Sequence, residues 1–156
     1  MKVVDFLSPD AVIPTLAGAS KATVLIEMAA FLAARRYAGT AIDAEALCRT
    51  LEEREQLAST AIGDGIAIPH GKLDNIDRLV GVLGRSPTGL DFDSIDGKPT
   101  YIVFLLVAPT HSAGDHLQAL ARLSRLFRDG ALRQRLLEAA DGATMFRIIA
   151  EEDAKY

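Results

Sequence analysis

The sequence predicts an α/β protein, a three-layer α/β/α sandwich in which a mixed β-sheet is flanked by helices. Apolar residues recur at helical spacing from Ser20 onward and again from about Ser112 to the end of the chain. Between these regions lie shorter stretches of strand character, above all the unbroken apolar run from Tyr101 to Ala108. Because helical segments come before and after the strand region in the sequence, we expect helices to cover the two faces of one sheet.

The composition limits the class of protein. With 156 residues, of which 49% are apolar and 24% charged, we expect a single folded domain over residues 1–156. The formal net charge of −4 argues against a nucleic-acid partner, because phosphate neutralisation needs a basic surface. A single cysteine, Cys48, suits a reducing compartment, and we expect it to pack inertly in a helix. There is no signal-peptide pattern and no apolar run near the ~18 residues of a membrane span, so we expect a cytoplasmic protein.

The N-terminal part of the chain predicts an extension followed by two helices. Residues 1–19 are short apolar pieces broken by prolines and a glycine, and we expect them to cap the domain. Ser20 is the expected N-cap of a helix that ends at residues 37–39, with one apolar stripe: Val24, Leu25, Met28, Ala29 and Leu32. Asp43 is the expected N-cap of a second helix that reaches about Glu55. That helix buries Leu47 and Leu51 and exposes three glutamates: Glu52, Glu53 and Glu55.

The middle of the chain predicts strands and turns. Gly63-Asp64-Gly65 is a turn, and the apolar residues 66–68 form a strand that delivers His70 between Pro69 and Gly71. Residues 79–85 alternate like a strand, residues 86–89 form a turn, and Asp96-Gly97 turns the chain again. The run from Tyr101 to Ala108 predicts a central strand buried on both faces and ended by Pro109.

The remainder predicts three helices. One begins within residues 112–118, where Ser112 with Asp115 and Asp115 with Gln118 both match capping boxes. Its expected apolar stripe is Leu117, Leu120, Ala121, Ser124 and Phe127. Asp129-Gly130 interrupts it, a shorter helix carries Leu132, Leu136 and Leu137, and Asp141 caps a last one.

His70 is the principal candidate for chemistry. A proline fixes the backbone before it, and a glycine after it allows a backbone or a phosphoryl group to approach closely. An imidazole with a pKa near ~6.5 is largely neutral at cytoplasmic pH and can act as a nucleophile without a separate base. The alternative is a histidine that ends a strand and only hydrogen-bonds a carbonyl.

The other candidates are weaker on residue patterns alone. His116 lies in the first turn of a predicted helix, where a neutral imidazole donates to an anion, although a partly buried structural histidine explains it equally well. Arg54 lies near the motif and suits phosphate oxygens, or else it pairs with Glu52 or Glu55 at the surface. We expect His111 to be exposed and incidental, and a single lysine, Lys72, is weak evidence.

Several other chemistries are excluded. Zinc-ligand spacings, the P-loop and the nucleophile elbow are all missing, so we expect no metal and no cofactor. Gly63-Asp64-Gly65 lacks the third glycine of a dinucleotide-binding fingerprint. Asp91, Asp93 and Asp96 are explained by turns and caps rather than by a cation.

The stretch from Ser59 to Lys72, with its core Ile68-Pro69-His70-Gly71-Lys72, resembles a known family. The chain is similar to the enzyme IIA proteins of the bacterial phosphoenolpyruvate phosphotransferase system, of the mannitol/fructose type, and most of all to their nitrogen-regulatory branch. The likeness extends over nearly the whole chain through further segments: Leu7-Ser8-Pro9, Arg54-Glu55-Gln56-Leu57, residues 91–96 and His116-Leu117.

The resemblance implies a role for each candidate. His70 accepts a phosphoryl group from an HPr-type carrier protein, His116 orients or hydrogen-bonds it, and Arg54 lies near the phosphoryl group. It also implies the mixed sheet flanked by helices. Ala58 and Asp64 stand where relatives often have glycine and asparagine; neither replaces a reactive group, although the Asp64 carboxylate adds charge near the site.

Four functions follow as expectations. The first is a regulatory phosphocarrier, because the chain stops near Tyr156 without a fused IIB or membrane IIC segment; the regulated partners are not specified. The second is a sugar-specific IIA that passes phosphate to a IIB partner of a fructose or mannitol permease. A binding module without phosphotransfer and a small metallohydrolase are the third and fourth.

Overall fold

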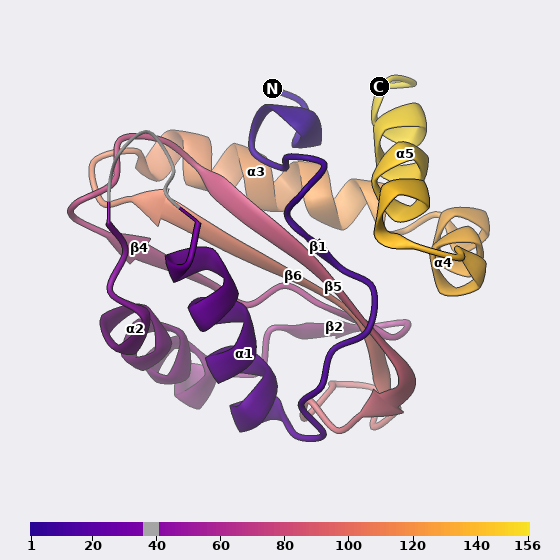
Figure 1. Cartoon of the computed structure of the whole chain (residues 1–156), viewed down its shortest axis with the longest axis horizontal. Coiled ribbons are helices and arrows are strands. Elements are labelled where there is room, and N and C mark those ends of the chain that lie inside the picture. Colours follow the sequence, from indigo (N-terminus) through magenta and orange to yellow (C-terminus); the bar gives the residue numbers. More distant parts are fainter. Residues whose placement is uncertain (36–40) are drawn as a thin grey trace.

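The computed structural model describes residues 1–35 and 41–156 and has three layers. Helices α1 (Lys21–Ala33) and α2 (Ala44–Leu57) cover one face of the sheet (Figure 1). Helix α3 (Ala113–Leu126) lies across the other face, and α4 (Gly130–Glu138) and α5 (Gly142–Asp153) pack at its end. The predicted α/β/α sandwich is confirmed.

The sheet is mixed and is built around one central strand. Its order is β1 (Val12–Ile13), β5 (Val80–Leu90), β6 (Thr100–Pro109), β3 (Ile66–Ala67) and β2 (Ala61–Gly63). Strand β4 (His70–Leu73) also pairs with β6, further along the same edge as β3. Strands β5 and β6 are antiparallel, as are β2 and β3, whereas β1 runs parallel to β5, and β3 and β4 run parallel to β6.

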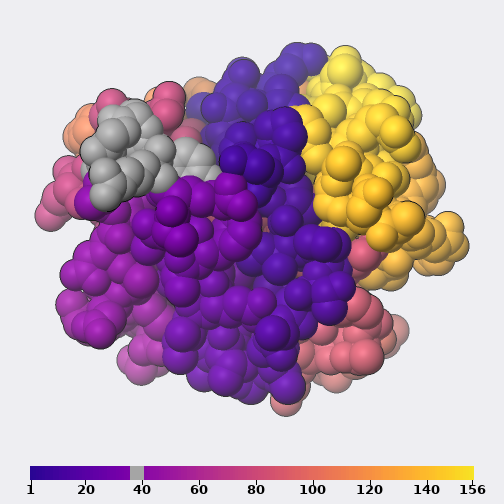
Figure 2. All heavy atoms as spheres, in the orientation of Figure 1, coloured from indigo at the N-terminus to yellow at the C-terminus, as the bar shows by residue number. Residues whose placement is uncertain are grey.

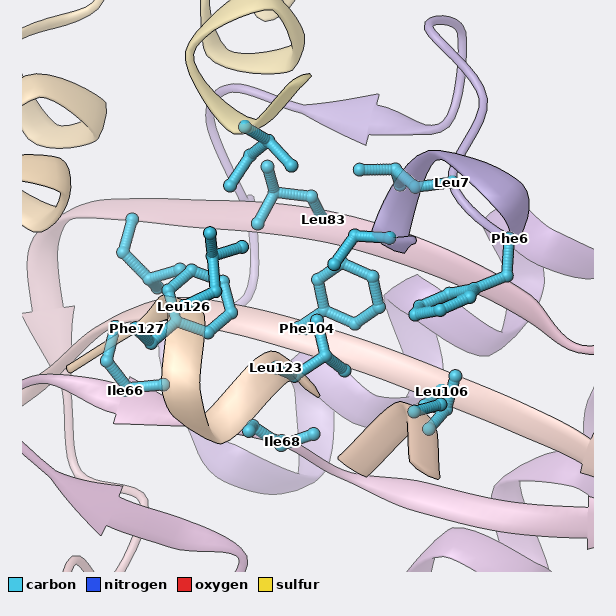
Figure 3. Packing of buried hydrophobic residues seen from close by; sticks show 14 of the residues in the cluster. Phe6, Leu7, Ile66, Ile68, Leu83, Phe104, Leu106, Leu123, Leu126 and Phe127 are labelled. Carbon is cyan, nitrogen blue, oxygen red and sulfur yellow. The ribbon is translucent and has the colours of Figure 1, made fainter. Parts of the chain in front are cut away.

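Strand β6 separates two apolar clusters, as its unbroken apolar sequence predicts. Ile102, Phe104 and Leu106 pack on the α3 side, whereas the residues between them pack on the α1 and α2 side. Figure 3 shows the first cluster, in which Phe104 packs between the N-terminal segment and α3. Because successive side chains of a strand point to opposite faces, a strand covered on both faces has no polar alternation.

The N-terminal segment does more than cap the domain. After the 3₁₀ turn η1 (Val3–Asp5), it adds β1 to the sheet edge, parallel to β5. Val3, Leu7 and Ala11 are buried in the α3-side cluster. The space-filling view shows this segment lying between α1 and the C-terminal helix α5 (Figure 2).

The predicted helix starts are confirmed, with one exception in capping. The predicted N-caps Ser20, Asp43 and Asp141 each accept hydrogen bonds from the first turn of their helices. Asp129, predicted only to interrupt the preceding helix, caps α4 in the same way. Ser112 precedes α3 without a side-chain capping bond, so its predicted capping box is wrong. The stripe of α1 is buried as predicted, and its predicted end at residues 37–39 lies outside the described residues.

Two local predictions are wrong because tertiary contacts decide them. Residues 86–89 continue β5 as an irregular extension instead of forming a turn, and the pairing with β6 resumes at Leu90, opposite Thr100. Leu117 is 70% exposed, and the buried face of α3 is rotated relative to the prediction: His116, Ala119, Leu123 and Leu126. In the described part of the chain, no helix has the length and apolar character needed to cross a membrane.

Candidate functional site

A glycine-flanked turn and a broken strand position His70. Gly63, Asp64 and Gly65 all have positive φ, at 95°, 56° and 78°, which turns β2 back into β3. Strand pairing stops at Ile68 and Pro69 and resumes at His70, which lies opposite Leu106. The sequence predicts a histidine after the end of a strand, whereas the structure makes it the first residue of the next strand.

The His70 ring is held in one tautomer. Its Nδ1 lies 2.7 Å from the main-chain oxygen of Ile68. A carbonyl oxygen only accepts, so Nδ1 carries the hydrogen and Nε2 keeps its lone pair. Burial lowers the pKa of His70 below its usual value, opposed by the bond to Ile68 and reinforced by the charge of Arg54. The carbonyl bond and the nucleophilic role, which the sequence leaves as alternatives, are therefore compatible.

His116 faces His70 from α3. The two ring centroids lie 5.4 Å apart, with the ring planes inclined at 73°. His116 is only 7% exposed, and its Nε2 is buried without a hydrogen-bond partner among the described residues. Burial, together with positive charge on His70 and Lys72, lowers the pKa of His116 to about 4. A buried polar atom without a partner is costly, so this nitrogen is suited to a ligand that reaches the site.

Arg54 lies in the last turn of α2 and is half-buried. Its Nη1 donates to the main-chain oxygen of Ala58 at 2.9 Å, and its charge acts on His70. The predicted alternative, an ion pair with Glu52 or Glu55, is wrong, since Arg54 forms no ion pair within the described residues. The structure thus brings all three predicted site residues, Arg54, His70 and His116, into one region.

Exposed apolar side chains lie on the two helices that carry Arg54 and His116, on β2 and on the loop that approaches Gly63. Leu57 at the end of α2 is 82% exposed, and Ile95, which approaches Gly63, is 87% exposed. Ile62 on β2 and Leu117, which follows His116, are exposed as well. Large exposed apolar side chains of this kind are available for a protein–protein contact.

The remaining candidates lie outside the reactive pair. His111 is exposed, as predicted, and Lys72 acts on His116 through its charge. Cys48 is half-buried, and burial raises the pKa of its thiol, which favours the inert packing that the sequence predicts.

The sequence prediction missed one residue beside the site. Glu55 is buried rather than solvated, and it pairs with Lys21 of α1. Helical spacing carries the signal, because Glu55 continues the i, i+4 stripe of Leu47 and Leu51, the other two buried residues of α2. The prediction grouped Glu55 with Glu52 and Glu53 by its charge and so missed its position on this stripe.

Comparison with known proteins identifies the family of the chain. Residues 5–152 match the family model "Phosphoenolpyruvate-dependent sugar phosphotransferase system, EIIA 2". The chain belongs to this family. It is therefore a component of the phosphotransferase-system type, as its Ile68-Pro69-His70-Gly71-Lys72 motif indicates.

Individual relatives come from two branches of the family. The chain is 39% identical over 150 residues to a nitrogen regulatory protein of Bradyrhizobium diazoefficiens, covering 96% of this chain and 95% of the relative. It is 35% identical over 153 residues to the fructose-specific EIIABC component of Bacillus subtilis, covering 98% of this chain but 24% of that longer protein. The crystal structure of nitrogen regulatory protein IIA-Ntr from Neisseria meningitidis superposes with a TM-score of 0.85 at 26% identity, over 94% of this chain and 98% of that one. The likeness supports a phosphoryl carrier with a regulatory role.

Proposed function

We propose that Nε2 of His70 accepts a phosphoryl group from an HPr-type carrier protein in the cytoplasm, and that the phosphorylated form regulates partner proteins. One observation supports this most directly: the free Nε2 of His70 lies in a site with the buried, unpartnered Nε2 of His116, on rings whose centroids are 5.4 Å apart. A phosphoryl group on His70 would bring oxygens that accept from His116.

The transfer needs little covalent chemistry from the protein. The lone pair on Nε2 of His70 attacks phosphorus while the bond from phosphorus to the donor's histidine nitrogen breaks, and the donor leaves as a neutral imidazole. No proton has to move, because Nδ1 of His70 keeps its hydrogen. The ring becomes cationic as the new bond forms, and the Ile68 carbonyl, 2.7 Å from Nδ1, stabilises that charge.

The neighbours of His70 supply alignment and charge. His116 stays neutral at neutral pH, since its pKa is about 4, and in the tautomer with hydrogen on Nε2 it donates to a phosphoryl oxygen. Arg54 adds a fixed positive charge that acts on His70. The exposed apolar side chains of Leu57, Ile62, Ile95 and Leu117 form the docking surface, and a phosphoryl dianion placed among them alters which partners bind.

The proposal is tested with the whole protein, phosphoenolpyruvate, enzyme I and an HPr-type carrier. We expect acid-labile phosphate on the wild type, none on His70→Ala, and slower labelling of His116→Ala. A wild-type protein that stays unlabelled would contradict the proposal. If wild type and His70→Ala also bound a target equally, a binding module without phosphotransfer would replace it.

A second candidate function is supported by the fructose-specific relative. The likeness to the EIIABC component of Bacillus subtilis covers 98% of this chain. In this alternative, His70 passes its phosphoryl group to a IIB protein of a sugar permease. Rapid loss of label to a fructose-type or mannitol-type IIB protein, together with sugar uptake that depends on His70, would favour it over the regulatory role.

A further inference from the structure

Glu55 directly follows Arg54 in the last turn of α2, and its carboxylate is buried. Its side chain is 4% exposed. Oε1 accepts from the main-chain nitrogen of Thr60 at 3.0 Å and from Lys21 Nζ at 2.9 Å, and Oε2 accepts from the hydroxyl of Thr60. Every oxygen of this carboxylate is therefore committed to a fixed partner, which a buried charge requires.

The hydrogen bonds continue from Thr60 to the reactive ring. The main-chain nitrogen of Ile68 donates to the Thr60 carbonyl at 3.0 Å, and the Ile68 carbonyl lies 2.7 Å from Nδ1 of His70. Thr60 and Ile68 are thus the only residues between the Glu55 carboxylate and the imidazole along this path. If the Thr60 segment shifts, the carbonyl that selects the tautomer of His70 shifts with it.

Lys21, which pairs with Glu55, also contacts a third segment, residues 91–93. Lys21 Nζ lies 5.1 Å from the ring centroid of Phe92 and 3.5 Å from Asp93 Oδ2. Ser59 also joins this segment, since its hydroxyl donates to the Phe92 carbonyl at 2.6 Å. The start of α1, the end of α2 and residues 91–93 therefore converge on Ser59 and Thr60.

A buried ion pair adds little net stability, because desolvation offsets most of the attraction. The effect of the Glu55 carboxylate on geometry is larger: two directed hydrogen bonds from Thr60 end on it and Lys21 holds it in place, so it defines the position of the Thr60 segment. Glu55 itself is too buried to touch a docking protein.

We infer that Glu55, held by Lys21, is a positioning residue for phosphoryl transfer: through Thr60 and Ile68 it keeps His70 in the tautomer whose Nε2 is free to attack. This inference rests on the proposed function for its kinetic consequence, but the tautomer of His70 is a property of the unphosphorylated protein. Without the constraint, a neutral imidazole populates both tautomers, and the form with hydrogen on Nε2 has no lone pair there.

The test compares Glu55→Ala and Glu55→Gln with the wild type and with Glu53→Ala, an exposed glutamate of the same helix. Long-range ¹H–¹⁵N spectra of the imidazoles report the tautomer of His70. Transfer from a phosphorylated HPr-type carrier, measured against protein concentration, gives the maximal rate and the half-saturating concentration. Circular dichroism shows that each variant is folded.

We expect Glu55→Ala to populate the tautomer with hydrogen on Nε2 and to lower the maximal rate roughly ten- to a hundredfold at an unchanged half-saturating concentration. Glu55→Gln should restore both readouts to near wild type, because its amide still accepts from the Thr60 nitrogen and donates to the Thr60 hydroxyl. Glu53→Ala should match the wild type.

Folded Glu55→Ala with the wild-type tautomer and rate would overturn the inference, as would Glu55→Gln failing as badly as Glu55→Ala. If Glu55→Ala does not fold, Thr60→Val removes one bond at similar volume and must shift the tautomer in the same direction. A shifted tautomer in a protein that never accepts phosphate would leave the positioning role intact and refute the proposed function instead.

Discussion

Arg85 and His116 are equally buried, each 7% exposed, but they differ in whether their polar atoms have hydrogen-bond partners. Arg85 lies on β5 and donates to the main-chain oxygens of Pro14, Leu136 and Ala139 at 2.7–2.9 Å. His116 lies on α3 and leaves its Nε2 without a partner in the described structure.

The difference separates a structural region from a reactive one. The guanidinium of Arg85 closes the C-terminal end of α4 and joins it to the N-terminal segment, so its bonds are satisfied within the fold. Nε2 of His116 carries the free-energy penalty of a buried polar atom without a hydrogen bond, and a ligand that bonds to it would remove that penalty. Burial alone therefore does not distinguish a structural polar residue from a functional one, whereas the state of its hydrogen bonds does.

The largest stability effect is expected at Arg85. Arg85→Met should lower the free energy of unfolding by about 3–5 kcal/mol, because it removes several charge-assisted bonds and leaves buried carbonyls unpaired. Urea unfolding measures this, and the folded fraction should accept phosphate at the wild-type rate. Arg135→Ala, which breaks an exposed ion pair with Glu151, is the control and should cost less than about 1 kcal/mol. A loss at Arg85 no larger than this control would refute the structural role.

Substitution of His116 should have the opposite pattern to Arg85→Met: a large effect on phosphoryl transfer and a small one on stability. His116→Leu should slow phosphoryl transfer about a hundredfold, since one aligned donor is lost. Its free energy of unfolding should be unchanged or raised by up to about 1 kcal/mol, because the unpartnered nitrogen is gone. A quenched phosphoryl-transfer assay measures the rate, and urea unfolding of the same samples measures the free energy of unfolding. A variant that is destabilised like Arg85→Met would show that His116 is held for stability.

The acid stability of the protein should depend on His116. Its pKa is about 4 in the folded chain and near its usual 6.5 in the unfolded chain, so the unfolded state binds the proton first as the pH falls. This contribution is fully present above pH 6.5, is lost between pH 6.5 and 4, and amounts to about 1 kcal/mol between pH 6.5 and 5.5. Urea unfolding of wild type and His116→Gln at both pH values isolates it, since the carboxylates contribute equally to both proteins.

The smallest expected effect is a shift in titration at Arg54. The charge of Arg54 lowers the pKa of His70, so Arg54→Gln should raise that pKa and move the acid limb of the transfer rate to higher pH. Titration of the His70 ring by NMR measures the shift. Arg49→Gln, an exposed arginine of the same helix, is the control and should leave the titration unchanged.

Much of the scaffold was predictable from local patterns. The central strand from Tyr101 to Ala108 and the caps at Ser20, Asp43 and Asp141 depend on neighbours within a few residues, and the structure confirms them. The errors at residues 86–89 and at Leu117 arise where pairing with β6 or packing of α3 overrides the local signal.

By itself, the sequence determined that His70 follows a short strand between Pro69 and Gly71, and its motif determined the family. Only the tertiary structure decided that His116 faces His70 and that Glu55 pairs with Lys21 and Thr60. The physical reason is one of range. Periodicity and capping depend on adjacent residues, whereas desolvation and hydrogen-bond satisfaction depend on segments that meet only when the layers pack.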